Sequence, residues 1–298
     1  MARLRVLGVD AGGSATRAVV VEGDDVIARF DEPPLNVLLH AHAFERLVEM
    51  IARANVAAAG LGLAGLRGPE HATEVEHGLA AATGIDVVVV DDTEAALAGA
   101  FSDGPGIVVI AGTGSNAVGR DRSGRTVRAG GYGFLLGDEG SAYWFGRQAL
   151  HAALQSHDRI GPTSKALEAV VRAEYGLDFD AIVRLVYRDP ADRQVLARLA
   201  RPVMALADDP VVTAILDAGS DYLIALASVL RAQLATDGPD DGLPVAMHGG
   251  VFRNAYVRER FVAATGAVAT ARTPEFGALD VALQRLRKHA THGLARSS

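Results

Sequence analysis

Cysteine is absent from the 298-residue chain. Its absence excludes disulfide bonds, thiolate-bound zinc, cysteine-held iron–sulfur clusters and cysteine nucleophiles. Positive charge is also scarce, because 29 Lys and Arg residues face 36 Asp and Glu residues and leave a net charge of −7. A chain of this charge lacks the basic field that holds polyanions, so we expect neither nucleic acid nor a membrane surface as a partner.

Long apolar runs and a targeting segment are missing as well. No uninterrupted apolar run reaches membrane-spanning length, and residues 1–5 lead directly into a strand pattern. Hydrophobic residues make up 49% of the chain and charged residues 22%, the balance of an ordinary globular protein. We therefore expect a cytoplasmic α/β protein that is long enough for two packed domains.

Strand and helix patterns alternate through the first hundred residues. Three β-branched runs separated by glycine turns predict a β-meander, and helical spacing then alternates with short apolar strands. The predicted strands span 5–9, 18–21, 26–30, 57–63 and 87–90, with helices over 41–54 and 70–83 and another from 93. The first domain therefore has the order βββαβαβ.

A second meander follows and also has a turn of small residues after its first strand, which we interpret as a weak structural repeat. The pattern is then almost wholly helical from 142 to about 235. The other predicted elements are strands over 106–111, 117–120, 126–129, 243–248 and 267–270 and helices over 255–264 and 276–289.

Two glycine turns, one in each meander, are candidates for phosphate binding. The turn at 10–16 follows a strand that ends in Asp10, and the turn at 112–116 reads Gly-Thr-Gly-Ser-Asn. Glycines let backbone N–H groups approach a phosphate closely, and a carboxylate can hold the water shell of Mg²⁺. The alternative is that both turns are ordinary hairpins that need small residues.

Asp91 and Asp92 stand where the last strand of the first domain ends and a helix begins. A carboxylate in this place is commonly an N-cap. Two adjacent acids point in different directions, so one can cap the helix while the other faces the region where α/β sheets place ligands. Capping remains an alternative explanation for both.

Two further glycine-rich segments are candidate ligand sites. Five glycines lie between 130 and 140, together with two acids, ahead of a helix with the only tryptophan. That many glycines cost too much entropy for a mere connection, and such a loop can approach a small polyol closely. Gly249 and Gly250 form a strand–helix junction of the kind that receives a nucleoside.

The order of these motifs resembles the BadF/BadG/BcrA/BcrD ATPase family and, within it, the N-acetylglucosamine kinases. The likeness covers residues 5–30, 87–150 and 243–285, and the run from Gly137 to Trp144 is its most specific part. It implies an actin-like, ribonuclease H-like fold of two domains, each with a five-stranded mixed sheet flanked by helices, and a ligand cleft between the domains.

The resemblance implies an N-terminal domain at 1–103 and a C-terminal domain at 104–298 with a helical insertion at about 146–240. This division also allows the C-terminal helix to pack against the N-terminal domain. Two positions depart from the family pattern. Ala11 stands where a third glycine is usual, and Ala15 stands where Lys or Arg is usual, with Arg17 as a candidate substitute.

The resemblance further implies ATP and Mg²⁺ as cofactors, with Asp10 holding the ion through water and Asp92 as catalytic base against a sugar 6-hydroxyl. The implied sugar-binding residues are Asn36, Asp92, Ser115, Asn116, Gly131, Tyr132, Gly133 and Asp138. The implied ATP-binding residues are Gly12, Gly13, Ser14, Thr16, Gly112, Thr113, Gly114, Ala218, Gly249, Gly250 and Asn254.

The expected reaction is ATP-dependent phosphorylation of N-acetylglucosamine to its 6-phosphate. Glucosamine and N-acetylmuramic acid are alternative acceptors, and the related kinases suggest a homodimer. A non-catalytic sugar or nucleotide sensor and a cluster-free ATPase are alternatives from a different class. The cluster-bearing activators of the family are excluded, because their iron–sulfur cluster needs cysteine.

Overall fold

The computed structural model describes residues 4–13, 15–38, 40–235 and 242–295. Its contacts divide the chain into two compact units, one of Met1–Gly104 and Thr270–Ser298 and the other of Pro105–Ala269. The first unit is therefore discontinuous in sequence. Each unit has a five-stranded sheet of its own.

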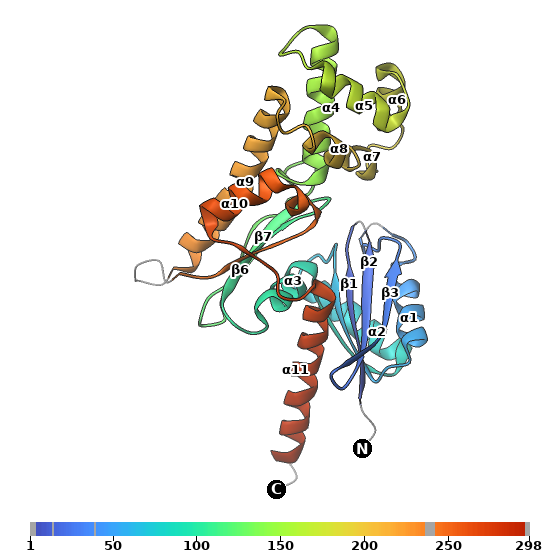
Figure 1. The fold of residues 1–298 in the computed structure, drawn as a ribbon. Coiled ribbons are helices and arrows are strands. Elements are labelled where there is room, and N and C mark those ends of the chain that lie inside the picture. The colour runs from blue at the N-terminus through green and yellow to red at the C-terminus, as the bar shows by residue number, and fades with distance from the viewer. Residues whose placement is uncertain (1–3, 14, 39, 236–241, 296–298) are drawn as a thin grey trace. The chain divides into compact units, whose positions relative to one another are not determined.

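The sheet of the first unit has the strand order β3-β2-β1-β4-β5 (Figure 1). Its strands are β1 (Arg5–Ala11), β2 (Thr16–Glu22), β3 (Asp25–Glu32), β4 (Ala58–Leu63) and β5 (Asp86–Asp91). The first three strands pair antiparallel, as the predicted meander requires, whereas β4 and β5 run parallel to β1. The carboxyl ends of β1, β4 and β5 therefore share one edge of the sheet, where Asp10 and Asp91 lie.

Helices cover both faces of this sheet. They are α1 (Ala43–Ala54), α2 (Pro69–Thr83), α3 (Asp92–Phe101) and α11 (Pro274–Ala295). On one face, Leu47 of α1 and Leu79 of α2 share a buried cluster with Leu7. On the other face, Leu279 of α11 is buried with Val6. Apolar side chains on alternate sides of β1 thus hold a layer of helices on each face.

The last helix, α11, approaches the sheet at two glycines that are neighbours in β1 and β4. Gly8 pairs with Gly60, and a Cβ at either position would overlap a backbone carbonyl oxygen of α11. The two carbonyl groups are those of Glu275 and Ala278. Only glycine permits so close an approach, so the first turns of α11 are fixed beside the carboxyl end of β1.

The sheet of the second unit has the strand order β10-β9-β6-β7-β8. Its strands are β6 (Gly106–Ala111), β7 (Ser115–Arg120), β8 (Thr126–Gly130), β9 (Val245–His248) and β10 (Val268–Ala269). The second meander pairs antiparallel, and β9 runs parallel to both β6 and β10. The two sheets therefore repeat the same arrangement, with two antiparallel and two parallel pairs of neighbouring strands.

The predicted helical stretch is a set of separate helices that follow one another along the chain. They are α4 (Ala142–Asp158), α5 (Lys165–Tyr175), α6 (Phe179–Arg188), α7 (Gln194–Ala197), α8 (Ala200–Met204) and α9 (Pro210–Leu234). A 3₁₀ turn, η1 (Gly250–Arg253), and α10 (Ala255–Thr265) follow β9. These helices and the sheet share one buried core.

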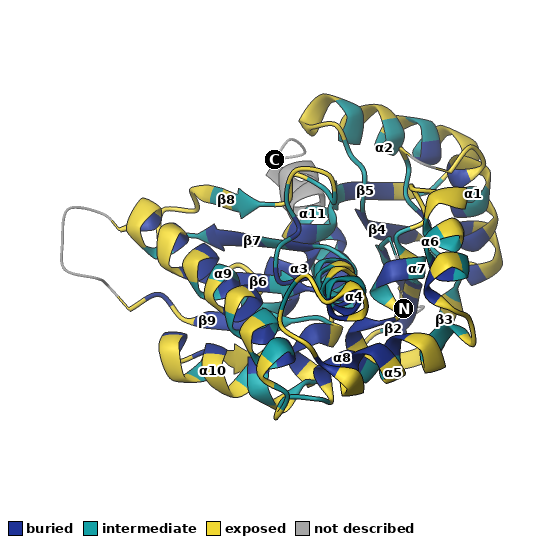
Figure 2. Cartoon of the chain, turned by 90° about the horizontal axis from the view of Figure 1, so that it is seen from above, coloured by how far each residue is buried: buried dark blue, intermediate teal, exposed yellow. Residues whose placement is uncertain are grey.

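Within the described part of the chain, α9 alone is long and apolar enough to cross a membrane by length and composition. Its Leu216, Leu223 and Leu230 lie in the core of the second unit. Figure 2 shows buried and exposed residues alternating along the helix. This pattern is typical of a core helix with one face turned to solvent.

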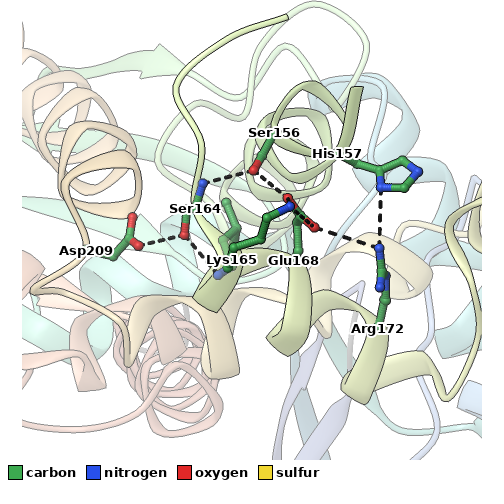
Figure 3. A network of polar contacts seen from close by, with 8 residues as sticks. Ser156, His157, Ser164, Lys165, Glu168, Arg172 and Asp209 are labelled. Atoms are coloured by element: carbon green, nitrogen blue, oxygen red, sulfur yellow. Dashed lines mark hydrogen bonds and ion pairs between the residues drawn. The ribbon is translucent and has the colours of Figure 1, made fainter. Parts of the chain in front are cut away.

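A polar network joins α4, α5 and the start of α9 (Figure 3). The Ser156 hydroxyl donates to Glu168 Oε1 at 2.6 Å and accepts the Ser164 N–H at 2.9 Å. The Ser164 hydroxyl donates in turn to Asp209, the N-cap of α9, at 2.6 Å. Hydrogen bonds from Lys165 and Ser156 lower the pKa of Glu168. These members use one another as partners, so we interpret the network as a brace between helices.

Candidate active site

Asp10 lies near the end of β1, on the face of the sheet that carries α11. Side chains alternate along a strand, so Asp10 shares the face of Gly8, where α11 packs. Its register partner in β2 is Arg17. Burial and the neighbouring Glu275 carboxylate raise the pKa of Asp10 to about 7, while Arg17 opposes the rise. Asp10 is thus a sheltered carboxylate with too little positive charge around it.

Asp91 and Asp92 take different roles. Asp91 is the N-cap of α3, and its Oδ1 accepts the Thr93 N–H at 3.0 Å and the Thr93 hydroxyl at 2.6 Å. Asp92 is the first residue of the helix. Burial, then the charge and hydrogen bond of Asp91 and the charge of Asp10, raise the pKa of Asp92 to about 8. A raised pKa makes a carboxylate a stronger base, which suits proton transfer from a hydroxyl.

In the first glycine turn, some of the predicted ATP-binding residues make hydrogen bonds that hold the turn itself together. The Gly12 N–H donates within the turn at 3.1 Å and closes the hairpin. Thr16 is fully buried, and its hydroxyl donates to the Pro33 carbonyl at 3.1 Å. Gly13 is half-buried, and the predicted Ser14 lies outside the described residues. The backbone of the turn, rather than the Thr16 side chain, is therefore the part suited to a phosphate.

Asn36 lies in the loop after β3. Its Oδ1 accepts the Leu38 N–H at 2.9 Å, and its own N–H donates to His40 Nδ1 at 2.9 Å. Gly65 packs against the same amide so closely that a Cβ there would overlap Oδ1. The carbonyl side of the Asn36 amide is therefore held in one orientation.

Glu275 is a carboxylate of this site that the motifs did not reveal. It is the second residue of α11 and is only 4% exposed. Its Oε1 accepts the Thr273 hydroxyl at 2.6 Å, whereas its buried Oε2 has no hydrogen-bond partner. Its charge acts on Asp10. The only local signal is a Thr-Pro-Glu helix start, which says nothing about a site at the other end of the chain.

The second glycine turn, at 112–115, joins β6 to β7 and meets the N-terminus of α4. Within the turn, the Gly112 N–H donates to the Gly114 carbonyl at 2.9 Å. The Ala142 N–H of α4 donates to the Gly112 carbonyl at 2.8 Å, and the next N–H donates to the Thr113 carbonyl at 3.3 Å. The first N–H groups of α4 are thus hydrogen-bonded to the turn, which fixes the turn beside the positive end of the helix.

Asp138, an expected sugar ligand, is engaged with this turn. Its Oδ1 accepts the Ser115 N–H at 3.2 Å, and the Ser115 hydroxyl donates to the Glu139 carbonyl at 2.6 Å. Burial raises the pKa of Asp138, while the Ser115 N–H and the Arg193 guanidinium oppose the rise. Arg193 Nη1 lies 3.9 Å from Asp138 Oδ2 and is a further residue that the motifs did not reveal. These contacts join the 130–141 loop to the second glycine turn.

Asn116, Glu139 and Tyr222 form a polar wall beside the turn. The Oδ1 of Asn116 is buried without a hydrogen-bond partner. Burial and then the charge and hydrogen bond of Glu139 raise the pKa of Tyr222. Gly130 pairs with Asn116 in the sheet, and a Cβ on Gly130 would lie 3.4 Å from the Tyr222 hydroxyl. Several donors and acceptors therefore gather where the loop meets β7, as a polyol ligand requires.

The glycine-rich loop presents large apolar side chains to solvent. Tyr132, Leu135 and Leu136 are 73%, 81% and 82% exposed. Gly131 and Gly133 have φ angles of 74° and 80°, which side-chain-bearing residues adopt rarely. Exposed apolar groups on such a loop are suited to contact with a ligand.

Gly249 brings the end of β9 close to the second glycine turn, at 112–115. Its φ is 111°, and a Cβ there would overlap the Ala111 carbonyl oxygen and lie 3.0 Å from the Gly112 nitrogen. Gly250, in contrast, has open space around it. The predicted turn at 112–115 and the predicted Gly-Gly junction are therefore neighbours.

Asn254 and Ala218 have simpler surroundings. Asn254 caps α10, because its Oδ1 accepts the Val257 N–H at 3.1 Å, and its Nδ2 donates to the Met204 carbonyl at 3.0 Å. Ala218 is exposed on α9. The Asn254 side chain therefore has a structural role in the described contacts.

The residues present fit a hydrated Mg²⁺ ion, the metal that the family resemblance implies. Asp10 and Glu275 offer carboxylate oxygens, the donors that Mg²⁺ prefers, and one Glu275 oxygen lacks a partner. Among the described residues, no group of three His, Cys, Asp or Glu side chains could hold an ion directly. Mg²⁺ commonly keeps several waters, so a hydrated ion suits this donor set.

Curated relatives of this chain are amino-sugar kinases by name. An N-acetylmuramic acid/N-acetylglucosamine kinase from Clostridium acetobutylicum is 40% identical over 123 residues, which cover 39% of this chain and 38% of that protein. An N-acetyl-D-glucosamine kinase from Dictyostelium discoideum is 39% identical over 66 residues, 22% of this chain and 21% of that protein. The aligned segments thus span well under half of either relative.

Solved structures extend the likeness to nearly the whole chain. A candidate N-acetylglucosamine kinase from Chromobacterium violaceum is 28% identical, with a TM-score of 0.79 over 93% of this chain and 98% of that one. A ROK family glucokinase from Streptomyces griseus, solved with glucose and AMPPNP, is 17% identical, with a TM-score of 0.61 over 94% and 99%. These likenesses confirm the predicted actin-like fold with two five-stranded mixed sheets.

The family itself follows from a match along most of the sequence. The family model matches residues 7–278, which include Asp10, both glycine turns, the 130–141 loop and Gly249. With this match and the fold in agreement, the chain belongs to the BadF/BadG/BcrA/BcrD ATPase family.

Proposed function

We propose that this protein is an ATP-dependent kinase that phosphorylates the 6-hydroxyl of an amino sugar, with N-acetylglucosamine as the first candidate. The names of the relatives support this substrate class. The observation that carries the proposal is Asp92, a half-buried acid at the start of α3 whose pKa is raised by burial and by the neighbouring Asp91. Because Asp91 already caps the helix, Asp92 is available for an acceptor hydroxyl.

Asp92 would orient that hydroxyl and accept its proton. The hydroxyl oxygen attacks the γ-phosphorus of ATP, the bond from that phosphorus to the bridging oxygen of ADP breaks, and the hydroxyl proton passes to the Asp92 carboxylate. A positioned base contributes about 10²–10⁴-fold to such a transfer. Most of the remaining catalysis comes from in-line positioning and charge stabilisation.

The nucleotide would be held mainly by backbone. We propose that the turns at 10–16 and 112–115 offer N–H groups to the phosphates, and that Gly249 allows close approach beside Gly112. A Mg²⁺ ion, when bound, would supply positive charge to the phosphates. Asp10 would hold the water shell of that ion.

The acceptor would be held by the polar wall of the second unit. The buried Oδ1 of Asn116 can accept a hydroxyl or amide proton, and the side chains of Glu139 and Tyr222 offer an acceptor and a donor. Exposed Tyr132 is suited to cover an apolar sugar face. An acetamido group presents both a donor and a methyl group to such a wall.

We also propose Mg²⁺ as the metal, a cytoplasmic location and a homodimer. The carboxylates of Asp10 and Glu275 support Mg²⁺ as the metal, and the absence of cysteine is consistent with a cytoplasmic location. Light scattering after size-exclusion chromatography tests the third, because a monomer mass of 31.0 kDa is known from the sequence.

The test is an ADP-release assay with N-acetylglucosamine, glucosamine, N-acetylmuramic acid, N-acetylmannosamine, glucose and no acceptor. We expect turnover with one amino sugar well above that with water. Slow ADP release that no sugar accelerates would overturn the kinase proposal. That outcome would favour a sensor or a cluster-free ATPase.

A further inference from the structure

Glu275 is a buried carboxylate that the fold alone does not explain. Its Oε1 has the Thr273 hydroxyl as a partner, as expected near a helix start. Its Oε2 is buried and has none. A buried charged acceptor without a partner is costly, so a structural role would favour glutamine or an apolar residue here.

Nearby positive charge does not remove this cost. Arg29 Nη1 lies 3.9 Å from Glu275 Oε1, beyond hydrogen-bond distance, and the Arg29 side chain is 58% exposed. The same guanidinium lies over the Phe276 ring, 5.1 Å from its centroid. Such an exposed, loosely placed ion pair contributes little, and it leaves Oε2 unsatisfied.

The position of Glu275 is nevertheless tightly fixed. The Glu275 carbonyl lies against Gly8 in β1, and Gly277, two residues further on, packs against the Ala95 carbonyl of α3. A Cβ at Gly8 or Gly277 would overlap these backbone oxygens. The fold therefore holds the Glu275 carboxylate in a set place beside Asp10 without supplying a partner for it.

Two neighbouring carboxylates without a cation repel each other. Asp10 lies two residues from Gly8 on the same face of β1, and the backbone of Glu275 packs against Gly8, so both acids belong to one end of this face. A hydrated divalent cation would relieve this repulsion and give Oε2 a water donor.

We propose that Glu275 is a positioning residue for metal-bound nucleotide, holding the water shell of the divalent cation together with Asp10. The inference rests on the proposed kinase function. It assigns the C-terminal helix a part in metal binding in addition to its packing. Glu275 does not touch the reacting atoms in this role.

The chain supplies a matched control for the experiment. Both α2 and α11 begin with Pro-Glu, so Glu70 has the same place in its helix as Glu275. Glu70 is exposed, whereas Glu275 is buried. Glu275→Gln and Glu70→Gln therefore make the same chemical change at the same helix position, with and without burial.

The measurement is calorimetric binding of a non-hydrolysable ATP analogue, with Mg²⁺ and with EDTA. In wild type and Glu70→Gln we expect the same gain in affinity from Mg²⁺. In Glu275→Gln we expect that gain to fall about tenfold, as for other residues that orient metal-bound groups, with little change in EDTA. A purely structural residue would weaken binding in both conditions.

Each outcome decides a separate point. If folded Glu275→Gln keeps the full gain in nucleotide affinity from Mg²⁺, the role of Glu275 is overturned and the kinase proposal stands. Wild type that binds no nucleotide would overturn both. If Glu275→Gln is unfolded by circular dichroism, Glu275→Asp keeps the charge on a shorter side chain. A reduced Mg²⁺ gain in that variant supports the role, and a full gain overturns it.

Discussion

Gly249 lies so close to the Ala111 carbonyl group that no side chain fits between them. The two residues end the neighbouring parallel strands β9 and β6, and Gly249 has a φ of 111° and a ψ of 166°. Residues with side chains avoid this backbone region. The contact therefore sets the spacing between the end of β9 and the turn that begins at Gly112.

Gly249→Ala should destabilise the protein by about 2–4 kcal/mol, because it combines backbone strain with a steric overlap. Gly250→Ala is the matched control, since nothing lies within 4 Å of a Cβ at that position. We expect its effect to stay below about 0.5 kcal/mol. Urea denaturation measures both free energies of unfolding, and equal effects would contradict the described contact.

Asp92→Asn should lower the rate of phosphoryl transfer by about 10²–10⁴-fold while nucleotide binding is retained. The comparison variant is Asp91→Asn, which keeps an N-cap acceptor for Thr93 but removes a charge that raises the pKa of Asp92, so it should shift the pH profile and not abolish transfer. Steady-state kinetics with the preferred sugar test both variants. Near-normal turnover in Asp92→Asn would refute its assignment as base.

The stability of the same variant should depend on pH. The native pKa of Asp92 is raised by burial and by Asp91 above the value of 3.8 in the unfolded chain. Between these values the native state binds more protons, so the contribution of Asp92 to stability falls as the pH rises. Asp92→Asn should therefore be more stable than wild type at pH 8, with the difference vanishing near pH 4. Thermal unfolding at both pH values checks the sign.

Tyr222→Phe should raise the KM for the amino sugar about 5–10-fold, the effect of one lost hydrogen bond, and leave the KM for ATP unchanged. Tyr256→Phe is its control. Tyr256 also donates to a carboxylate, that of Asp217 at 2.7 Å, on the α9–α10 face and away from Glu139. A change in both KM values, or equal effects in the two variants, would contradict the polar wall as the sugar site.

Glu168→Gln should cost about 1–2 kcal/mol at pH 7, because it weakens the hydrogen bonds that join α4 to α5. The pKa of Glu168 is lowered from 4.5, so its contribution is present above that pH and is lost as the pH falls. The difference between variant and wild type should shrink below pH 4.5. Glu174→Gln, which weakens the more exposed pair with Arg198, should cost about 0.5 kcal/mol or less.

Both meanders could be predicted from sequence, because β-branched runs between glycine turns are a local signal. The predicted strand 18–21 begins two residues earlier in the structure, at Thr16. Its register pairing with β1 extends to Ala11 opposite Thr16. Pairing with a neighbour, which local propensity does not include, thus sets the length of a strand.

The site was predictable only where a motif is local. The adjacent acids Asp91 and Asp92 indicated the start of a helix. Which of the two caps that helix depends on how the strand enters it. Glu275 could not be predicted, because its place beside Asp10 is a long-range packing result. The sequence offered one hint, a glycine inside each of two strands, Gly8 and Gly60. Such glycines indicate that another backbone segment packs closely there, but they do not identify the segment.

The close packing of α11 on β1 has a consequence for synthesis. The first strand leaves the ribosome early, yet the helix that completes its buried face follows the whole second unit in the sequence. Until that helix arrives, one side of the first sheet, including Val6 and Val19, stays uncovered. A nascent chain therefore exposes apolar sheet surface until α11 has been made, so the core of the first unit is completed only after the second unit has been synthesised.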